Sequence, residues 1–245
     1  MNKAMLIDQT KCIGCGACTV ECKAKYDASY SILRTEMKGY ETGSYPNVKL
    51  RYKKHACMHC FVAACKEICP VDAIFHVEGE NGGMLEVDKE TCIGCGACID
   101  ACPFTVPQLD PEDDDNMEKC SFCAFRVVEG ESTYCAEACP VGAILFGDRE
   151  ELISRGEERV EVLREAGKEK ASLYGKEDTG VLLLIDEDPE EYELEPEGFT
   201  LSRAGWHALS AYGGFALAAA IGGYGYKIAR ERLEENKEKE ETKNG

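Results

Sequence analysis

The chain has 245 residues, enough for one or two domains, and 16 of them are cysteine. Its formal net charge of -18 argues against phosphate backbones as partners, so we expect no binding to nucleic acid. The first residues lack the charged and apolar pattern of a signal peptide, so export of the chain would need a partner that has the signal.

The sequence repeats itself around two of its cysteine groups. Cys12-Ile-Gly-Cys-Gly-Ala-Cys18 recurs unchanged as Cys92-Ile-Gly-Cys-Gly-Ala-Cys98, at an offset of 80 residues. Each copy follows an apolar run that predicts a short strand, and these runs are 5–7 and 84–87. Each of these units should therefore be a strand followed by a loop that holds the cysteines.

A second repeat joins the other two cysteine groups. Cys65-x3-Cys69-Pro-Val-x-Ala-Ile recurs as Cys135-x3-Cys139-Pro-Val-x-Ala-Ile, at an offset of 70 residues. The residues after each copy predict further short strands, at 75–77 and 145–146. The pattern as a whole favours hairpins and short helices over long helices.

Longer elements are expected between and after the cysteine groups. Residues 31–56 alternate in part between apolar and polar and contain turn residues, which predicts an inserted hairpin. Asp148 is placed to cap a helix that runs to about Ala166. The apolar run 181–185 predicts a buried strand, and an acidic, proline-containing linker should follow it to about Glu197.

The sixteen cysteines fall in four groups of four. The first and third groups have the x2, x2, x3 spacing of the bacterial ferredoxin run that binds [4Fe-4S] clusters. The second and fourth groups keep the first x2 step and the final x3-Cys-Pro, with a longer loop before the third cysteine. The groups are Cys12, Cys15, Cys18 and Cys22; Cys57, Cys60, Cys65 and Cys69; Cys92, Cys95, Cys98 and Cys102; and Cys120, Cys123, Cys135 and Cys139.

These groups predict four [4Fe-4S] clusters that pass electrons. They predict no catalytic residue. A single Cys-x2-Cys pair is equally typical of a zinc site or a redox dithiol, but four complete groups with two ferredoxin runs favour iron–sulfur clusters. Sixteen thiolates supply four ligands to each cluster and leave no iron open to a substrate. In two-cluster ferredoxins the fourth cysteine of a run binds the neighbouring cluster.

The motifs resemble those of the four-cluster iron–sulfur subunits of the molybdopterin oxidoreductase family. The resemblance covers residues 1 to about 165 and depends on the motif order, on Cys57-Met-His-Cys, on Glu118-Lys-Cys and on Pro-Val-Gly-Ala-Ile-Leu-Phe-Gly-Asp148. It implies an α+β fold of two ferredoxin-like modules, each with two clusters, related by a pseudo-twofold. An inner module, about 53–110, would be inserted in an outer module within 1–147.

The resemblance also implies which cysteines share a cluster. The first group would pair with the fourth and the second with the third, with their fourth cysteines exchanged. Lys23 follows Cys22 where the other three groups have proline, a departure that removes no ligand. The implied ligand sets are Cys12, Cys15, Cys18 and Cys139; Cys120, Cys123, Cys135 and Cys22; Cys57, Cys60, Cys65 and Cys102; and Cys92, Cys95, Cys98 and Cys69.

Other side chains lie near the cysteines in the sequence. His59, between two expected ligands, either donates a hydrogen bond to a cluster sulfur or is a loop histidine satisfied within the protein. Four aromatic residues are expected to serve packing rather than electron relay: Tyr26, Tyr30, Phe104 and Phe122.

The C-terminal part contains a candidate membrane span. Residues 204–226 include no Asp, Glu, Lys or Arg and are long enough to cross a bilayer, although a buried apolar hairpin is the alternative. We expect a transmembrane helix at 201–226 after a segment of helix, strand and linker at 148–200, and a charged tail at 227–245. Lys and Arg mostly follow the span, which predicts a cytoplasmic C-terminus and a cluster domain outside.

Small residues predict where this span meets a partner. Gly214, Ala218 and Gly222 recur every four residues and would pack closely against another membrane helix. The tail, with Pro189-Glu-Glu-Tyr192 before a lone span, resembles that of membrane-bound formate dehydrogenase iron–sulfur subunits. The resemblance implies electron transfer between a molybdenum or tungsten pterin subunit and a membrane cytochrome b-type subunit with quinone. The alternatives are the same role in a membrane-bound NiFe hydrogenase or in a polysulfide or DMSO-type reductase.

Overall fold

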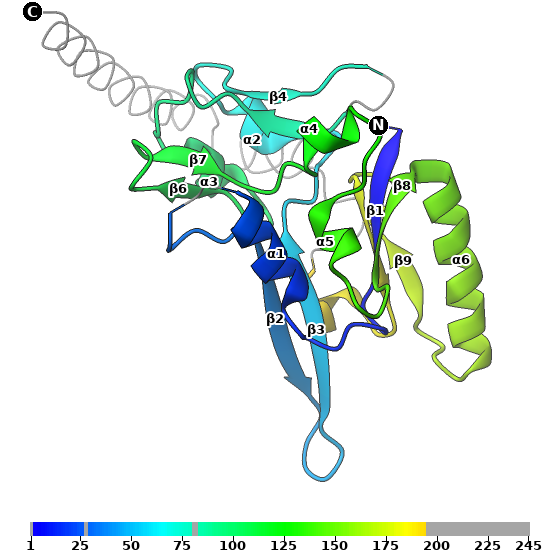
Figure 1. Ribbon diagram of the computed structural model, residues 1–245. Helices are drawn as coiled ribbons and strands as arrows, with labels where there is room; N and C mark the ends of the chain where they lie inside the picture. Colours follow the sequence, from blue (N-terminus) through cyan, green and yellow to red (C-terminus); the bar gives the residue numbers. More distant parts are fainter. Residues whose placement is uncertain (1, 27–28, 80–82, 195–245) are drawn as a thin grey trace, which may run out of the picture.

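The computed structural model describes residues 2–26, 29–79 and 83–194. This part of the chain forms a four-stranded sheet, three separate hairpins and several short helices beside the cysteine loops (Figure 1). The strands are β1 (Lys3–Asp8), β2 (Thr35–Thr42), β3 (Lys49–Ala56), β4 (Ile74–His76), β5 (Leu85–Val87), β6 (Gln108–Asp110), β7 (Asn116–Glu118), β8 (Ile144–Asp148), β9 (Ser172–Tyr174) and β10 (Val181–Ile185). The helices are α1 (Ala17–Lys25), α2 (Ala64–Glu67), α3 (Ala97–Ala101), α4 (Ala124–Val127), α5 (Tyr134–Glu137), α6 (Arg149–Glu165) and the 3-10 helix η1 (Pro189–Tyr192).

The four-stranded sheet has the order β8-β1-β10-β9, with β1 antiparallel to β8 and parallel to β10. Successive side chains of a strand point to opposite faces. Leu182 and Leu184 therefore pack towards α6, whereas Leu183 and Ile185 join the core that contains the cysteine loops. Because both faces are covered, every residue of β10 is buried, which confirms the buried strand predicted at 181–185.

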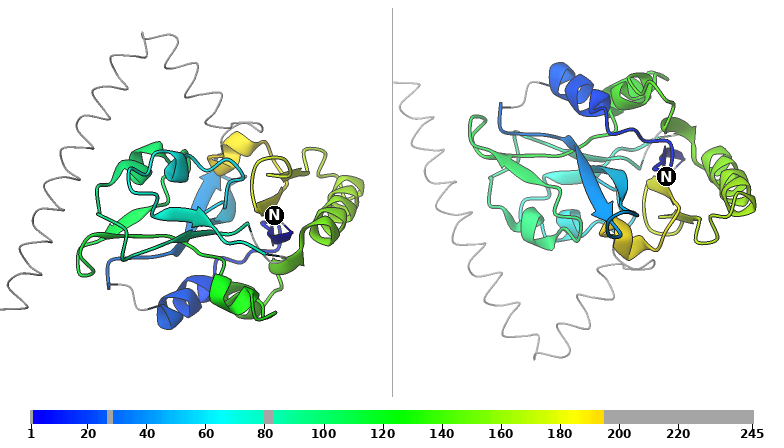
Figure 2. Two further views of the ribbon diagram at one scale, coloured as in Figure 1. Left: turned by 90° about the horizontal axis from the view of Figure 1, so that it is seen from above. Right: turned by 90° about the horizontal axis from the view of Figure 1, so that it is seen from below.

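Helix α6 begins at the predicted cap. The Asp148 carboxylate accepts hydrogen bonds from the backbone N–H groups of Glu150 (3.1 Å) and Glu151 (3.4 Å). The helix ends at Glu165, one residue before the predicted end, and its apolar side chains cover one face of the sheet. In Figures 1 and 2, α6 lies at the edge of the molecule opposite β6 and β7.

The repeated units fold in the same way. The backbone N–H of Asp8 donates to the carbonyl of Ala143, and that of Asp88 donates to the carbonyl of Ala73, both at 2.8 Å. The strand before the first cysteine group (β1) pairs with the strand after the fourth (β8). The strand before the third group (β5) pairs with the strand after the second (β4). The sequence repeats thus bring remote groups together in two equivalent pairs.

Lys23 changes the length of one helix. Helix α1 continues past Cys22 to Lys25, whereas α3 ends at Ala101, because Pro103 cannot continue a helix. The Lys23 ammonium donates to the carbonyl of Ile32 at 2.8 Å. Lysine in place of proline therefore allows α1 to continue, and its ammonium holds the segment that follows the helix.

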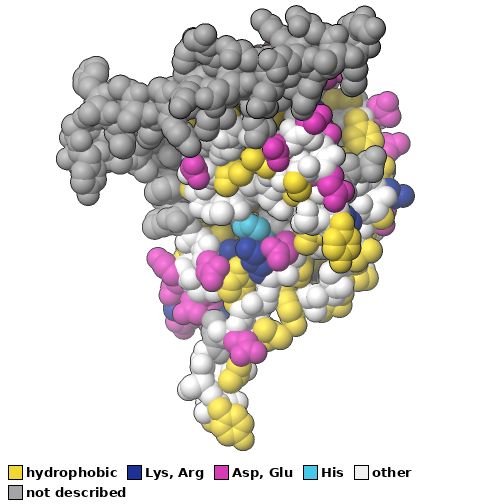
Figure 3. Space-filling view, turned by 90° about the vertical axis from the view of Figure 1, so that its left-hand side faces the viewer, with side chains coloured by type: hydrophobic (Ala, Val, Ile, Leu, Met, Phe, Trp, Pro, Cys, Tyr) yellow, Lys and Arg dark blue, Asp and Glu magenta, His cyan; other side chains and the backbone are white. Residues whose placement is uncertain are grey.

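The hairpin of β2 and β3 extends from the body of the protein, as predicted for 31–56 (Figure 3). Its tip exposes Tyr45, Val48 and Leu50. Figure 1 shows that β3 returns from this tip to the body, and the second cysteine group begins directly after it at Cys57.

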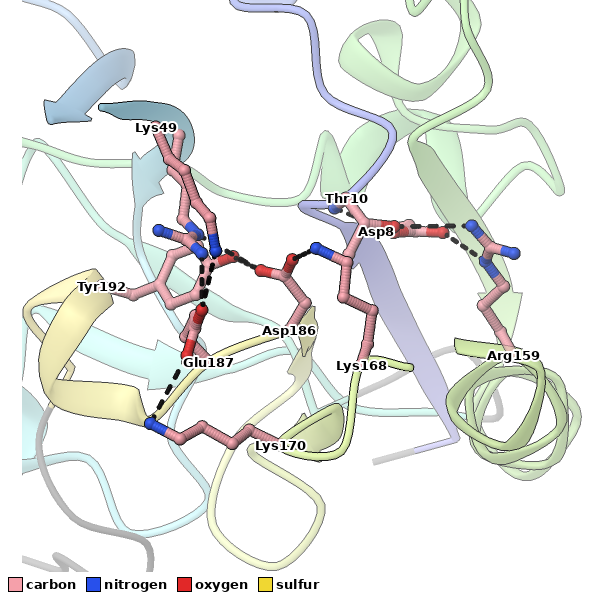
Figure 4. Close-up of polar contacts among 10 residues, drawn as sticks. Asp8, Thr10, Lys49, Arg159, Lys168, Lys170, Asp186, Glu187 and Tyr192 are labelled. Atoms are coloured by element: carbon pink, nitrogen blue, oxygen red, sulfur yellow. Dashed lines mark hydrogen bonds and ion pairs between the residues drawn. The ribbon is translucent and has the colours of Figure 1, made fainter. Parts of the chain in front are cut away.

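Residues 186–194 differ from the linker that we expected, because they pack against β3 (Figure 4). Arg51 contacts Asp186 (3.3 Å) and Glu187 (2.9 Å), and the Tyr192 hydroxyl donates to Asp186 at 2.7 Å. The Tyr192 ring is buried. Opposite charges and one large aromatic side chain thus hold the acidic segment, and further ion pairs come from Lys49, Lys168 and Lys170.

The expected membrane span cannot be placed in this fold. Residues 201–226, with the Gly214, Ala218 and Gly222 stripe, and the tail 227–245 lie outside the described residues. Within the ranges that the structure does describe, no helix has both the length and the apolar character needed to cross a membrane.

Candidate metal centres

All four cysteine groups share one backbone feature. The residue just before the second cysteine has a left-handed conformation in each group: Gly14 (φ 67°), His59 (φ 50°), Gly94 (φ 60°) and Phe122 (φ 56°). A Cβ at Gly14 would overlap the Tyr52 ring, and glycine adopts this conformation without strain. For His59 and Phe122 it costs about 1–3 kcal/mol, which the surrounding structure must offset. Glycine at two of the four aligned positions is a sequence signal for this conformation, but histidine and phenylalanine at the other two are not.

Three cavities are each lined by four cysteine side chains. Each cavity takes its cysteines from two groups that are remote in the sequence. We call these thiols set A (Cys12, Cys15, Cys18 and Cys139), set B (Cys22, Cys120, Cys123 and Cys135) and set D (Cys69, Cys92, Cys95 and Cys98).

The remaining four cysteines also interact with one another. The thiol of Cys60 interacts electrostatically with those of Cys57, Cys65 and Cys102, and we call these four set C. No three His, Cys, Asp or Glu side chains in the described ranges converge on the position of a single metal ion. Instead, the thiols of sets A, B and D each line a cavity of their own.

Contacts between sets give them a linear order. Thiols of neighbouring sets interact electrostatically with one another. Cys15, in set A, is exposed, whereas the other fifteen cysteines are buried or half-buried. The order is A, B, C, D, through the contacts Cys18 with Cys135, Cys57 with Cys120, and Cys65 with Cys98.

Burial raises the pKa of several of the free thiols. Desolvation raises the pKa of Cys22 and of Cys57 to about 12, and neighbouring thiols add to the effect. Iron binds the thiolate, so loading of a cluster must release protons from these side chains. The sites are therefore built for a metal group that compensates several buried negative charges at once.

His59 has a buried polar atom without a partner. The backbone N–H of Leu85 donates to His59 Nδ1 at 3.1 Å, so a neutral ring has its proton on Nε2. Burial, followed by the nearby Lys119 and Lys54, holds the pKa of His59 well below its usual value. Among the described residues Nε2 has no acceptor at full hydrogen-bond geometry, although the Cys120 backbone lies near the ring and acts to raise its pKa. The ring stacks on Phe122, with 3.6 Å between the ring centroids. This donor fits a bound group that presents acceptor atoms.

Two lysines are buried beside the thiols. Lys54 lines the cavities of both set A and set B. Burial lowers the pKa of Lys54, but the thiols around it raise the pKa by more, so the net shift is upward. Lys119 donates to the carbonyl of Cys120 at 3.1 Å and to that of Leu85. Lys119 stands in the Glu118-Lys-Cys motif, but the sequence assigns neither lysine a role, because no local pattern marks a lysine as buried.

Three of the four aromatic residues near the cysteines contact other parts of the protein. Phe122 is buried, and Phe104 packs against the same core. The Tyr26 ring lies 4.0 Å from the Arg34 guanidinium, and its hydroxyl contacts Ser121 Oγ at 3.2 Å. The expectation is wrong for Tyr30, whose side chain is 93 % exposed.

Thiol sets of this kind, on repeated strand and loop units, define an iron–sulfur electron-transfer protein. Comparison with known families agrees: a 4Fe-4S dicluster domain matches residues 4–70, and a second one matches residues 48–149.

Individual relatives identify the family. The chain is 34% identical to the formate dehydrogenase-O iron-sulfur subunit of Escherichia coli (strain K12), over 89% of this chain and 80% of the relative. It is 33% identical to the formate dehydrogenase iron-sulfur subunit of Haemophilus influenzae, over 88% of this chain and 78% of the relative. It is 37% identical to the thiosulfate reductase electron transfer subunit PhsB of Salmonella typhi, over 71% of this chain and 92% of the relative. The chain belongs to the family of iron–sulfur subunits of molybdopterin oxidoreductases, is formate dehydrogenase-like, and carries electrons through four [4Fe-4S] clusters.

Proposed function

We propose that the chain conducts electrons between a molybdenum or tungsten pterin subunit of the formate dehydrogenase type and a membrane cytochrome b-type subunit that serves quinone. The linear order of the thiol sets carries this proposal. A row of four clusters has two ends, and each end suits a different redox partner. Electrons enter at one end, pass from cluster to cluster and leave at the other.

Each thiol set is proposed to ligate one cluster. Sets A and B would form the outer module, within 1–147, and sets C and D the inner module, about 53–110. The matching hydrogen bonds of Asp8 and Asp88 support a pseudo-twofold between the modules. The cavities of sets A, B and D, which the cysteines of two groups line together, support the exchange of the fourth cysteine.

His59 is proposed to donate its Nε2–H to a cluster sulfur in set B or set C. Its ring lies in the loop of set C and stacks on Phe122, which lies in the loop of set B. A hydrogen bond to a cluster sulfur stabilises the reduced cluster and raises its potential.

His59→Phe keeps the ring stack but removes the donor. One cluster potential should fall, seen in a redox titration followed by electron paramagnetic resonance. The Leu85 N–H loses its acceptor, so thermal unfolding should also show a loss of about 1–3 kcal/mol in the free energy of unfolding. Four unchanged potentials would contradict the proposed hydrogen bond.

The C-terminal segment is proposed to anchor the protein by a single transmembrane helix at 201–226. The charge-free run 204–226 supports this proposal, and the stripe of Gly214, Ala218 and Gly222 would pack against the cytochrome b-type partner. The C-terminus would be cytoplasmic and the clusters outside, after export with a partner that has the signal.

Copurification tests the partner assignment. Solubilised complexes, captured through a tag on this chain, should contain molybdenum or tungsten and a large pterin subunit identified by mass spectrometry. A second candidate is a sulfur-compound reductase, because the match to PhsB covers nearly the whole of that relative. The partner's activity with formate or with thiosulfate distinguishes the two. Recovery of nickel with a hydrogenase subunit would contradict both.

A further inference from the structure

Lys54 lies between two thiol sets. It belongs to β3, three residues before the second cysteine group, and its side chain is only 5 % exposed. It lines the cavity of set A and also the cavity of set B. Its strongest favourable electrostatic partners are four thiols from these two sets: Cys135, Cys120, Cys18 and Cys22.

In the part of the chain that the structure describes, Lys54 has no ordinary counter-ion. Among the described residues it forms no ion pair with Asp or Glu, in contrast to Lys89, which pairs with Asp113 at 2.7 Å. Lys119, the other lysine beside the thiols, donates to two backbone carbonyls. A buried ammonium is retained only where negative charge compensates it. The negative charge available to Lys54 is that of the groups bound by sets A and B.

We propose that Lys54 is the shared counter-charge of the clusters in sets A and B and raises the reduction potential of both. Reduction adds one electron to a cluster and makes it more negative, so a nearby fixed positive charge stabilises the reduced state. Burial limits screening by salt. The electron comes from the neighbouring cluster or partner and passes to the next cluster, and no bond is formed or broken.

The position of Lys54 between two clusters affects electron transfer between them. One charge acts on both clusters, so their potentials rise together and the difference between the potentials of A and B changes little. Two independent charges would not couple the clusters in this way. This inference depends on the cluster assignment proposed above.

Lys54→Met tests the proposal by removing the charge and keeping most of the side-chain volume. In a redox titration followed by electron paramagnetic resonance, the midpoint potentials of clusters A and B should both fall. Those of clusters C and D should move much less. Lys54→Gln, which stays polar, is the second variant in case methionine disturbs packing, and Lys54→Arg should keep potentials near those of the wild type.

Lys53→Met is the matched control. Lys53 is the next residue of β3, so its side chain points to the other face, where it donates to the carbonyls of Tyr192 and Glu193. Loss of this charge should leave the A and B potentials nearly unchanged. Unshifted A and B potentials in both Lys54→Met and Lys54→Gln would overturn the proposal, as would equal shifts in all four clusters or a shift of the same size in Lys53→Met.

The cluster assignment is tested separately. Cys15→Ser and Cys123→Ser each remove one ligand of a single set, and the signal that each variant loses identifies cluster A or cluster B. If Cys15→Ser and Cys123→Ser remove the same signal, the assignment of the sets fails. If they remove different signals that do not respond to Lys54→Met, the assignment stands and the role of Lys54 fails.

Discussion

Cys22→Ser is expected to remove the cluster of set B, not the cluster held by the rest of its own group. The Cys22 thiol lines one cavity with Cys120, Cys123 and Cys135, and these three thiols and Lys54 are its electrostatic partners. Iron should fall from about sixteen to about twelve per chain, with acid-labile sulfide falling in parallel. Since set B lies between sets A and C, electron flow to quinone should nearly stop, whereas dye reduction by the catalytic subunit should continue.

Two matched variants decide between the possible pairings. Cys123→Ser removes a ligand of set B, and Cys15→Ser removes a ligand of set A. The spectrum of reduced Cys22→Ser should match that of Cys123→Ser. A match to Cys15→Ser would refute the exchange of the fourth cysteine, and zinc in place of iron in the wild-type chain would refute the clusters altogether.

Truncation after Glu197 is expected to release a soluble domain that keeps all four clusters but no longer delivers electrons to quinone. All sixteen cysteines precede residue 140, and the packed core continues to Leu194, so the cut leaves both intact. The contacts of Lys53 with the carbonyls of Tyr192 and Glu193 also remain. The measurements are the iron content of the soluble fraction and the rates with quinone and with a soluble dye.

A pair of substitutions separates helix packing from anchoring. Gly214→Leu with Gly222→Leu should keep the protein in the membrane and reduce quinone coupling, because leucine blocks close helix approach. Gly205→Leu with Gly213→Leu has the same spacing but lies off the small-residue stripe, so its effect should be smaller. A truncated chain that stays in the membrane fraction and couples to quinone at the full rate would show that 201–226 is not the anchor.

The sequence by itself determined the cofactor and most of the local elements. In ferredoxin runs three thiolate ligands of a cluster come from one short stretch of chain, so the x2 and x3 steps identify iron–sulfur chemistry without a fold. The buried strand 181–185 and the helix capped by Asp148 follow from side-chain periodicity and from a single hydrogen-bonding side chain. Each of these features depends on residues within a few positions of one another.

The tertiary structure decided what depends on remote residues. The cavity shared by Cys22 and Cys120, the stack of His59 on Phe122 and the place of Lys54 each join segments that are far apart in the chain. The packing of 186–194 on β3 also depends on remote residues. An acidic run predicts a solvated linker unless its cationic partners, such as Arg51, are known. Local pattern carries no information about such neighbours, because burial and charge pairing are set only when the chain has folded.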